Sequence, residues 1–154
     1  MIKVVMLWLR NDKGELLLAR RSDSKKQDPG LWGPSVTGKL EPDETFEAAL
    51  VRETQEELSL EPHSYSPFFL FETDFDHPDG EVRKFKVYFA DVTPETAAKV
   101  KFDPVEVAEV SWRTIDQIRL LLNSKPGEIL PASAFVLWER IFEALQTHQP
   151  ASAN

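Results

Sequence analysis

Carboxylate side chains are concentrated between residues 38 and 60, in the sequence GKLEPDETFEAALVRETQEELSL. Three of them fall within five residues, and three more lie in the segment before. The two groups are Glu53, Glu56 and Glu57, and Glu41, Asp43 and Glu44. Oxygen ligands of this kind suit Mg²⁺ or Mn²⁺, which bind through a few carboxylates, water and substrate phosphate. We therefore interpret this segment as a divalent-metal site for phosphate chemistry.

A helix that begins near Thr45, a favourable N-cap residue, would place Glu53, Glu56 and Glu57 on one face, within an arc of about 100°. Arg52 is expected to point away from this face. The neighbouring arc, which we expect to pack on a sheet, contains Leu50, Val51, Thr54 and Leu58. The carboxylates would then sit beside the buried arc, where solvent is partly excluded.

Such a helix carries an electrostatic strain. Like charges at i,i+3 and i,i+4 destabilise a helix by about 0.2–0.5 kcal/mol per pair, and anions near its C-terminal end are disfavoured further by the macrodipole. A cation among the oxygens would offset that strain. From the charges alone, a solvated acidic helix face is the other interpretation, and both stay open at this point.

Composition limits the classes of protein that fit. The chain has 154 residues, which suits one domain, predicted over residues 1–147 with a flexible tail over 148–154. The net charge of −8 disfavours stable binding to a nucleic-acid backbone. The absence of cysteine excludes disulfides and a thiol nucleophile and is compatible with a reducing cytoplasm. The N-terminus contains no recognisable signal peptide or membrane span, so we expect a cytoplasmic protein.

The rest of the chain predicts a mixed sheet with helices packed against it, an α/β arrangement. Strands are expected at residues 3–9, 15–20, 68–76, 81–92 and 107–112, with a short extended segment at 35–38. The first two should form a hairpin around the turn at 11–14, and residues 21–34 should form a loop. After a connection at 93–104 that has room for a helical turn, Thr114 and Gln117 resemble a capping box for a short helix. The last helix is expected at about 132–147.

Two patterns predict which faces are buried. The last helix carries an apolar stripe that we expect in the core: Phe135, Trp138, Ile141, Phe142 and Leu145. Residues 81–92 alternate, with Phe85, Val87 and Phe89 on one face and Lys84, Lys86 and Tyr88 on the other. The second of these faces could line a cleft or could be an exposed strand face.

The spacing within residues 38–60 resembles the signature of the Nudix (MutT-like) hydrolases. Five residues separate Gly38 from Glu44, seven more precede Arg52-Glu53, and the pair Glu56-Glu57 follows. All charged positions of the signature are filled. Thr54 stands where an aliphatic residue is usual. Ser59 stands where glycine is usual, so the loop that leaves the helix could take a different turn.

This resemblance implies the Nudix fold, a mixed β-sheet sandwiched between α-helices, and Mg²⁺-dependent hydrolysis of a nucleoside diphosphate linked to another group X. It implies that Glu53, Glu56 and Glu57 are metal ligands, with Mn²⁺ as a possible substitute for Mg²⁺. Glu53 would help to activate water, and the Gly38 carbonyl oxygen would be a further ligand. Arg52 would pair with Glu44 to hold the loop against the helix.

Several residues outside the signature have two interpretations each. The basic cluster Arg20, Arg21, Lys25 and Lys26 fits a solvated loop or an electrostatic guide for phosphates. Glu106 directly precedes the strand expected at 107–112 and Glu109 lies within it, in a region from which members of the family that this chain resembles often add a ligand or base. Trp32 and Phe46 could stack on a base, but we favour a place in the core. The three histidines, His63, His77 and His148, are predicted to be surface residues.

The substrate and the assembly state are less determined. The segment LWGPSVTGKLEPDE looks like that of Nudix enzymes acting on pterin or nucleoside triphosphates, which we favour, and is also similar to isopentenyl diphosphate isomerases. The isomerase chemistry relies on an active-site cysteine, which this chain lacks. A Nudix-fold nucleotide-binding or regulatory module without hydrolysis is the alternative function. We expect a small-molecule nucleotide or a related diphosphate as partner, and a homodimer is possible.

Overall fold

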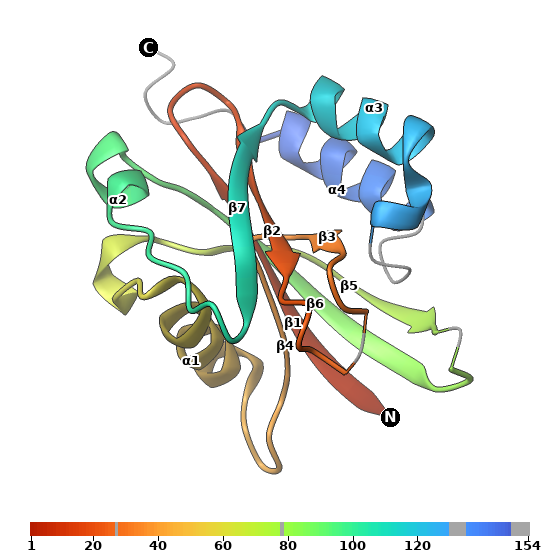
Figure 1. Cartoon of the computed structure of the whole chain (residues 1–154). Helices are drawn as coiled ribbons and strands as arrows, with labels where there is room; N and C mark the ends of the chain where they lie inside the picture. The colour runs from red at the N-terminus through yellow and green to blue at the C-terminus, as the bar shows by residue number, and fades with distance from the viewer. Residues whose placement is uncertain (27, 78, 130–134, 149–154) are drawn as a thin grey trace.

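The protein is a seven-stranded mixed sheet with helices on both faces (Figure 1). The computed structural model describes residues 1–26, 28–77, 79–129 and 135–148. The strands are β1 (Ile2–Arg10), β2 (Leu16–Arg21), β3 (Trp32–Gly33), β4 (Val36–Lys39), β5 (Phe68–Asp76), β6 (Val82–Asp91) and β7 (Val107–Arg113). The α-helices are α1 (Phe46–Leu58), α2 (Pro94–Ala98), α3 (Ile115–Ser124) and α4 (Phe135–Gln146), with 3₁₀ turns at Pro62–Ser64 and Pro126–Glu128. The predicted sandwich is therefore confirmed.

Strand β1 is the centre of the sheet. It runs parallel to β6 along its whole length, and on its other edge Val4–Leu7 pair antiparallel with β4. Strand β5 continues the sheet beyond β6, while β7 and β3 pair with β2. The predicted hairpin between the first two strands is confirmed only at its turn, where Arg10 pairs with Leu16. Beyond that point β2 diverges from β1, because β4 takes the remaining edge.

Both faces of β1 are buried, and its residues alternate between two cores. Val4, Met6 and Trp8 face the core under α3 and α4, and Val5 and Leu7 face the core under α1. The same alternation places Phe85, Val87 and Phe89 with α3 and α4, and Tyr88 on the opposite side, as the period of a strand requires. The stripe of α4 is buried at Trp138, Ile141, Phe142 and Leu145.

Helix α1 begins where the sequence predicts. The Thr45 side chain accepts a hydrogen bond from the Ala48 N–H at 3.1 Å, which satisfies one of the free donors of the first turn. The helix ends at Ser59, whose φ of 58° is the left-handed conformation that glycine favours at this position. The turn therefore follows the glycine geometry, contrary to the expectation of a different turn. A hydrogen bond of 2.9 Å from Ser59 Oγ to the Lys101 carbonyl accompanies it.

Other expectations are corrected in detail. Residues 21–34 contain β3, so they are not entirely loop. Val51 is 40% exposed and does not join the buried arc of α1. The start of the last helix predicted at 132–134 lies outside the described residues, as does the tail beyond His148. The His148 ring itself packs against the Phe89 ring, with 5.0 Å between the ring centres.

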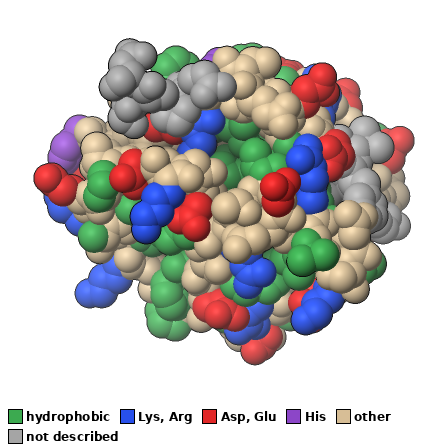
Figure 2. All heavy atoms as spheres, turned by 90° about the horizontal axis from the view of Figure 1, so that it is seen from above, with side chains coloured by type: hydrophobic (Ala, Val, Ile, Leu, Met, Phe, Trp, Pro, Cys, Tyr) green, Lys and Arg blue, Asp and Glu red, His purple; other side chains and the backbone are tan. Residues whose placement is uncertain are grey.

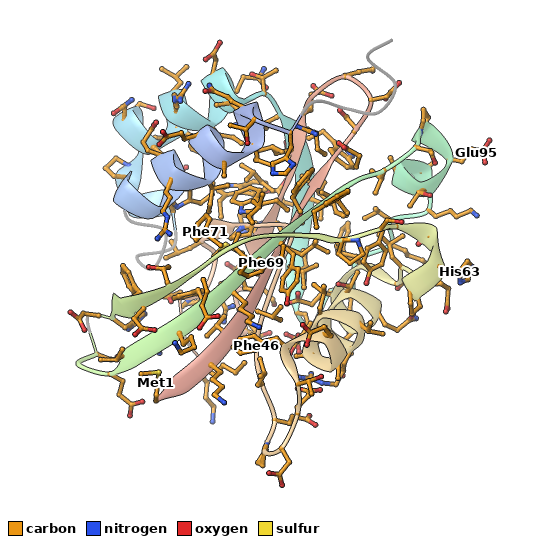
Figure 3. All side chains as sticks on the ribbon, turned by 180° about the vertical axis from the view of Figure 1, so that it is seen from behind. Met1, Phe46, His63, Phe69, Phe71 and Glu95 are labelled. Carbon is orange, nitrogen blue, oxygen red and sulfur yellow. The ribbon has the colours of Figure 1, made fainter. Side chains whose placement is uncertain are left out.

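The aromatic side chains of uncertain role lie in or against the core. Trp32 is 8% exposed and packs in the core under α3 and α4. Phe46 packs against the core under α1, and Figure 3 shows it at the start of that helix. The Lys86 ammonium lies 4.9 Å from the Phe46 ring centre and 5.8 Å from that of Phe69 on β5. No described helix combines the length and the apolar composition that a bilayer span requires.

Trp138 is expected to carry much of the attachment of α4 to the sheet, because it is fully buried and meets Trp8 edge to face, with 4.9 Å between ring centres. Trp138→Ala should lower the free energy of unfolding by about 3–5 kcal/mol. Leu120→Ala, at a residue of α3 that is 68% exposed, is the control and should change it by less than about 0.5 kcal/mol. Urea unfolding followed by circular dichroism measures both. Equal effects would contradict this role for Trp138.

Candidate active site

A cleft of about 650 Å³ opens where β4 meets α1 and extends across the sheet past β1 to β6. This volume lies within the range of small-molecule sites. Its walls differ in chemistry. Acidic side chains of α1 form one part, and basic side chains after β2 form a second. The third part, on β1 and β6, is mainly apolar with one arginine.

Gly38 and Glu53 lie together because β4 pairs with β1 and α1 packs against β4. A Cβ atom added to Gly38 would overlap the carboxylate of Glu53. Any side chain at this position would therefore displace Glu53. The requirement for glycine comes from this close approach, which allows the Gly38 backbone and the Glu53 carboxylate to face the same small space.

Arg52 connects the loop to the carboxylates of α1. Its guanidinium binds Glu44 through two hydrogen bonds of 2.8 Å, and its Nη1 donates to Glu53 at 2.9 Å and to Glu56 at 3.3 Å. A further bond of 3.2 Å goes to the Lys39 carbonyl oxygen. Arg52 thus does not point away from the acidic face, because its guanidinium contacts Glu53 and, one turn further along the helix, Glu56.

The predicted Arg52–Glu44 pair is present, and it shifts the pKa of both groups. The hydrogen bonds from Arg52, followed by one from the Glu41 N–H, lower the pKa of Glu44 to about 2, and the same pair raises the pKa of Arg52. The loop from Lys39 to Glu44 is therefore held to α1 by a charged, two-pronged contact.

Glu57 is a buried carboxylate with an unsatisfied oxygen. Its Oε2 atom has no hydrogen-bond partner among the described residues. Burial raises the pKa of Glu57 well above its ordinary value, and the charges of Glu53 and Glu106 raise it further. Arg21 and a hydrogen bond with the Thr37 backbone oppose this rise only in part. An ionised Glu57 is therefore stable only if a positive charge joins it.

Glu53 shows the same imbalance to a smaller degree. Burial is the largest cause of its raised pKa, and the charges of Glu56 and Glu106 add to it against the opposing effect of Arg52. The carboxylates of Glu53 and Glu57, whose charges are only partly compensated, form an all-oxygen donor set with the Gly38 backbone. Such a set fits Mg²⁺ or Mn²⁺.

The donors are not drawn together in the described part of the chain, where no three acidic, histidine or cysteine side chains already form a group able to hold a metal ion. The reason is visible in the contacts, because Arg52 Nη1 holds one oxygen each of Glu53 and Glu56. Mutual repulsion also keeps the carboxylates apart.

The tertiary structure separates Glu106 from Glu109. Glu106 lines the cleft near Glu53 and Glu57, and its carboxylate meets Lys25 at 2.6 Å. Glu109 instead pairs with Arg20 at 2.8 Å, and neither of them lines the cleft. Of the basic cluster, the side chains that line the cleft are Arg21, Lys25 and Lys26. Alternation in the strand cannot make this distinction, because Glu106 precedes the strand and is oriented by the turn that begins at Asp103.

Two cleft residues were missed or misplaced by sequence reasoning. His77 was expected at the surface, but its side chain is 9% exposed and lines the cleft. His63 is exposed, as expected.

Arg83 also lines the cleft and was not singled out from the sequence. It lies two residues before Phe85 on the same strand face, and this alternation could have identified it. Lys84, Lys86 and Tyr88 do not line the cleft.

The charge distribution on the face seen from above differs from that of a nucleic-acid-binding surface. Lys and Arg side chains there alternate with Asp and Glu side chains (Figure 2). A nucleic-acid backbone is bound by clustered positive charge. That the protein binds no nucleic acid stays a prediction.

Comparison with known proteins gives one family and several relatives. The family model described as NUDIX domain matches residues 2–133. A curated relative, isopentenyl-diphosphate Delta-isomerase of Citrobacter koseri, is 34% identical over 130 residues, which cover 80% of this chain and 68% of the relative.

Two solved structures are similar over most of the chain. DR0079 from Deinococcus radiodurans is 30% identical with a TM-score of 0.73, covering 90% of this chain and 82% of that one. A MutT protein from Methanosarcina mazei Go1 is 27% identical with a TM-score of 0.73, covering 96% of both chains.

Glu57→Gln tests the uncompensated charge. A carboxyl whose pKa is raised by folding stabilises the protein below its ordinary pKa, and this stability is lost as the pH rises through the raised value. At neutral pH the metal-free variant should therefore be more stable than the parent protein. Its melting temperature should rise by about 2–4 °C for each kcal/mol gained in the free energy of unfolding. It should also lose most of the stabilisation by added Mg²⁺ or Mn²⁺, as measured by differential scanning calorimetry.

The control for this experiment is Glu143→Gln, at an exposed position of α4, which should leave both melting temperatures unchanged. A less stable metal-free Glu57→Gln protein, or one with the full metal-induced shift, would contradict the interpretation.

Glu44→Gln tests the contact between loop and helix. The pKa of Glu44 is lowered from 4.5 to about 2, so its stabilising effect is present above pH 4.5 and is lost as the pH falls toward 2. The variant should be less stable than the parent at pH 7, and the difference should shrink across this interval. Urea unfolding at a series of pH values measures it, and a difference that does not depend on pH would be the contrary result.

Proposed function

This chain belongs to the Nudix family, and on that premise we propose that it is a divalent-metal-dependent pyrophosphohydrolase. It would cleave a phosphoanhydride bond of a nucleoside diphosphate linked to a group X, with a nucleoside or pterin triphosphate-like substrate favoured. The observation that carries the proposal is the buried Oε2 atom of Glu57, which lacks a partner among the described residues and lies in a cleft with Glu53 and Gly38. A buried anion in this position needs a cation, and the cation makes phosphate chemistry possible.

The metal site would consist of the carboxylates of Glu53, Glu56 and Glu57 and the carbonyl oxygen of Gly38, with Mg²⁺ preferred and Mn²⁺ as a possible replacement. When bound, the cation neutralises charge on the non-bridging phosphate oxygens and makes the attacking water more acidic. Glu53 is the best candidate to help activate that water, because its carboxylate lies in the cleft directly beside the Gly38 backbone.

Arg52 and Glu44 act through the other residues in this proposal. Arg52 contacts Glu53, Glu56 and the Lys39 carbonyl, while Glu44 holds its other edge. Both are positioning residues, since they keep the loop that follows Gly38 in register with α1. Glu44 would keep the guanidinium in place beside Glu53 and Glu56, which would hold the cation.

The substrate phosphates would be attracted by Arg21, Lys25 and Lys26, which line the same cleft. Lys25 is held by Glu106 at 2.6 Å. A substrate phosphate that binds Lys25 would break the ion pair between Lys25 and Glu106. The Glu106 carboxylate would then be available near Glu53 and Glu57. Glu106 is therefore the better candidate of the two for an added ligand or base, and Glu109 is set aside because it pairs with Arg20 outside the cleft.

Isomerisation of a diphosphate is the activity named for the Citrobacter koseri relative. This chain contains no cysteine, and that chemistry relies on an active-site cysteine, so we favour hydrolysis. A binding or regulatory module without hydrolysis is also less favoured, because all the acidic positions of the signature are filled. The cysteine-free composition is compatible with a cytoplasmic enzyme.

Hydrolysis is tested with a panel of nucleoside triphosphates, dinucleoside polyphosphates, nucleotide sugars and pterin triphosphate, with Mg²⁺ or Mn²⁺ and chromatographic identification of the products. Glu53→Gln should lower kcat by about 10²- to 10⁴-fold, the usual contribution of a general base, with a smaller change in KM. Glu109→Gln is the matched control and should keep kcat within about 2-fold.

Hydrolysis in H₂¹⁸O identifies the attacked phosphorus from the product that carries the label. No metal-dependent turnover of any substrate by the parent protein would overturn the proposal. Conversion of isopentenyl diphosphate to its isomer would favour the relative's activity instead.

A further inference from the structure

The cleft continues past the carboxylates to an arginine on the other side of the central strand. Strands β4 and β6 flank β1 on opposite edges, so α1 with its carboxylates and the β5–β6 turn lie on opposite sides of β1 (Figure 1). Arg83 is the second residue of β6, is 4% exposed and lines the cleft. A buried guanidinium that faces a cleft requires a partner for its charge and its donors.

Asp79 holds the Arg83 guanidinium in a fixed orientation. Its two carboxylate oxygens accept from Nη1 at 3.2 Å and from Nη2 at 2.8 Å. The Glu81 N–H donates a hydrogen bond of 3.0 Å to Asp79 Oδ1, and the Asp79 N–H donates one of 3.2 Å to His77 Nδ1. The turn therefore places the arginine before any ligand arrives, which lowers the entropy that binding would cost.

The donors of Arg83 are only partly used. A guanidinium carries five N–H groups, and the hydrogen bonds that Arg83 makes within the described residues use one on each of two nitrogens. The Nε–H and one N–H on each Nη remain, and the Nε–H with the neighbouring Nη N–H forms a planar fork that suits a pair of neighbouring acceptors.

Apolar side chains of the core, of which only 2–6% is exposed, line the cleft together with Arg83. Val4 and Met6 on β1 and Phe85 on β6 line this part of the cleft, and Val4 pairs with Phe85 across the parallel strands. A flat ring would find an apolar floor here, with an arginine at the edge. A contact that only closed the β5–β6 turn would not need this floor beside it.

We propose that Arg83, oriented by Asp79, is a specificity-determining residue that binds the ring of the group attached to the phosphates. The class of ring is a heteroaromatic base with two adjacent hydrogen-bond acceptors, as guanine has in O6 and N7 and cytosine has in O2 and N3. Adenine fits less well, because its amino donor lies beside its ring acceptors and would face the donors of Arg83. This inference rests on the proposed function for the nucleotide class of the substrate and deepens it.

A hydrocarbon substrate would leave the same fork without a partner. The isoprenoid part of isopentenyl diphosphate contains no hydrogen-bond acceptor, so Arg83 would be covered and its free donors unsatisfied. A site built to hydrogen-bond a polar group discriminates strongly against a ligand that lacks it. The arginine therefore also separates this cleft from one shaped for a hydrocarbon.

The test is Arg83→Met, which keeps length and apolar contact but removes the charge and the fork. Isothermal titration of GMP, CMP and AMP without metal measures base recognition independently of hydrolysis. The affinity for GMP and CMP should fall by about 10- to 100-fold, the usual discrimination of a two-pronged contact to a base, and that for AMP by much less. With GTP and ATP as substrates, the loss should appear in KM for GTP more than in kcat.

Arg119→Met is the matched control, since Arg119 binds Glu139 through two hydrogen bonds of 3.1 Å on the outside of α3 and α4. It should leave both affinities unchanged. Arg83→Lys keeps the charge without the fork and should also lose the preference of GMP over AMP, even if Arg83→Met does not fold.

The outcomes separate this inference from the proposed function. Binding of GMP that depends on Arg83, in a protein that hydrolyses no nucleotide, supports the inference while the proposed function fails. An unchanged ratio of GMP to AMP affinity in both variants overturns the inference, whether or not hydrolysis occurs. Absence of any nucleotide binding by the parent protein also overturns it.

Discussion

Crowded negative charge along α1 is the constraint on which the rest of the structure depends. Glu53 and Glu57 are drawn into a partly dehydrated space by the packing of α1 on the sheet, and burial raises the pKa of both. One buried oxygen of Glu57 has no partner among the described residues. A fold selected only for stability would replace these carboxylates, because an uncompensated buried charge is costly. A cation among these oxygens would offset that cost, which is the physical basis of the metal site that we propose.

Arg52 and Gly38 accommodate these crowded charges in the fold. Arg52 shares its guanidinium among Glu44, Glu53 and Glu56, which supplies positive charge to all three carboxylates. Gly38 allows the strand to approach so closely that any Cβ would overlap Glu53. The loop between them is tied to α1 by the Arg52–Glu44 contact. A cation that takes the place of Arg52 at Glu53 and Glu56 would leave this anchor at Glu44 intact.

The central position of β1 explains how one cleft can contain two kinds of chemistry. On one edge, β4 brings Gly38 to the carboxylates of α1; on the other, β6 brings Arg83 beside Phe85. The carboxylate end and the Arg83 end of the cleft therefore lie on different strands. The same scaffold occurs in a relative named as an isomerase, in keeping with the principle that function resides in sites rather than in folds.

Much of this could be predicted from the sequence, for identifiable reasons. The N-cap at Thr45, the alternation of β6 and the apolar stripe of α4 follow from local periodicity, which a single chain displays directly. The grouping of Glu53, Glu56 and Glu57 also follows from helical spacing, and the distance from Gly38 identified the family. The roles of these residues as ligands remain a proposal.

Contacts between distant segments were decided only by the tertiary structure. The sequence could not separate Glu106 from Glu109, because a turn and an ion pair with Lys25 orient the first of them. It placed His77 at the surface, whereas the β5–β6 turn buries the side chain against Asp79. It also predicted a full hairpin of the first two strands, which β4 prevents by pairing with β1. Periodicity within one segment determines which face a residue occupies, but only the packing of other segments determines what that face meets.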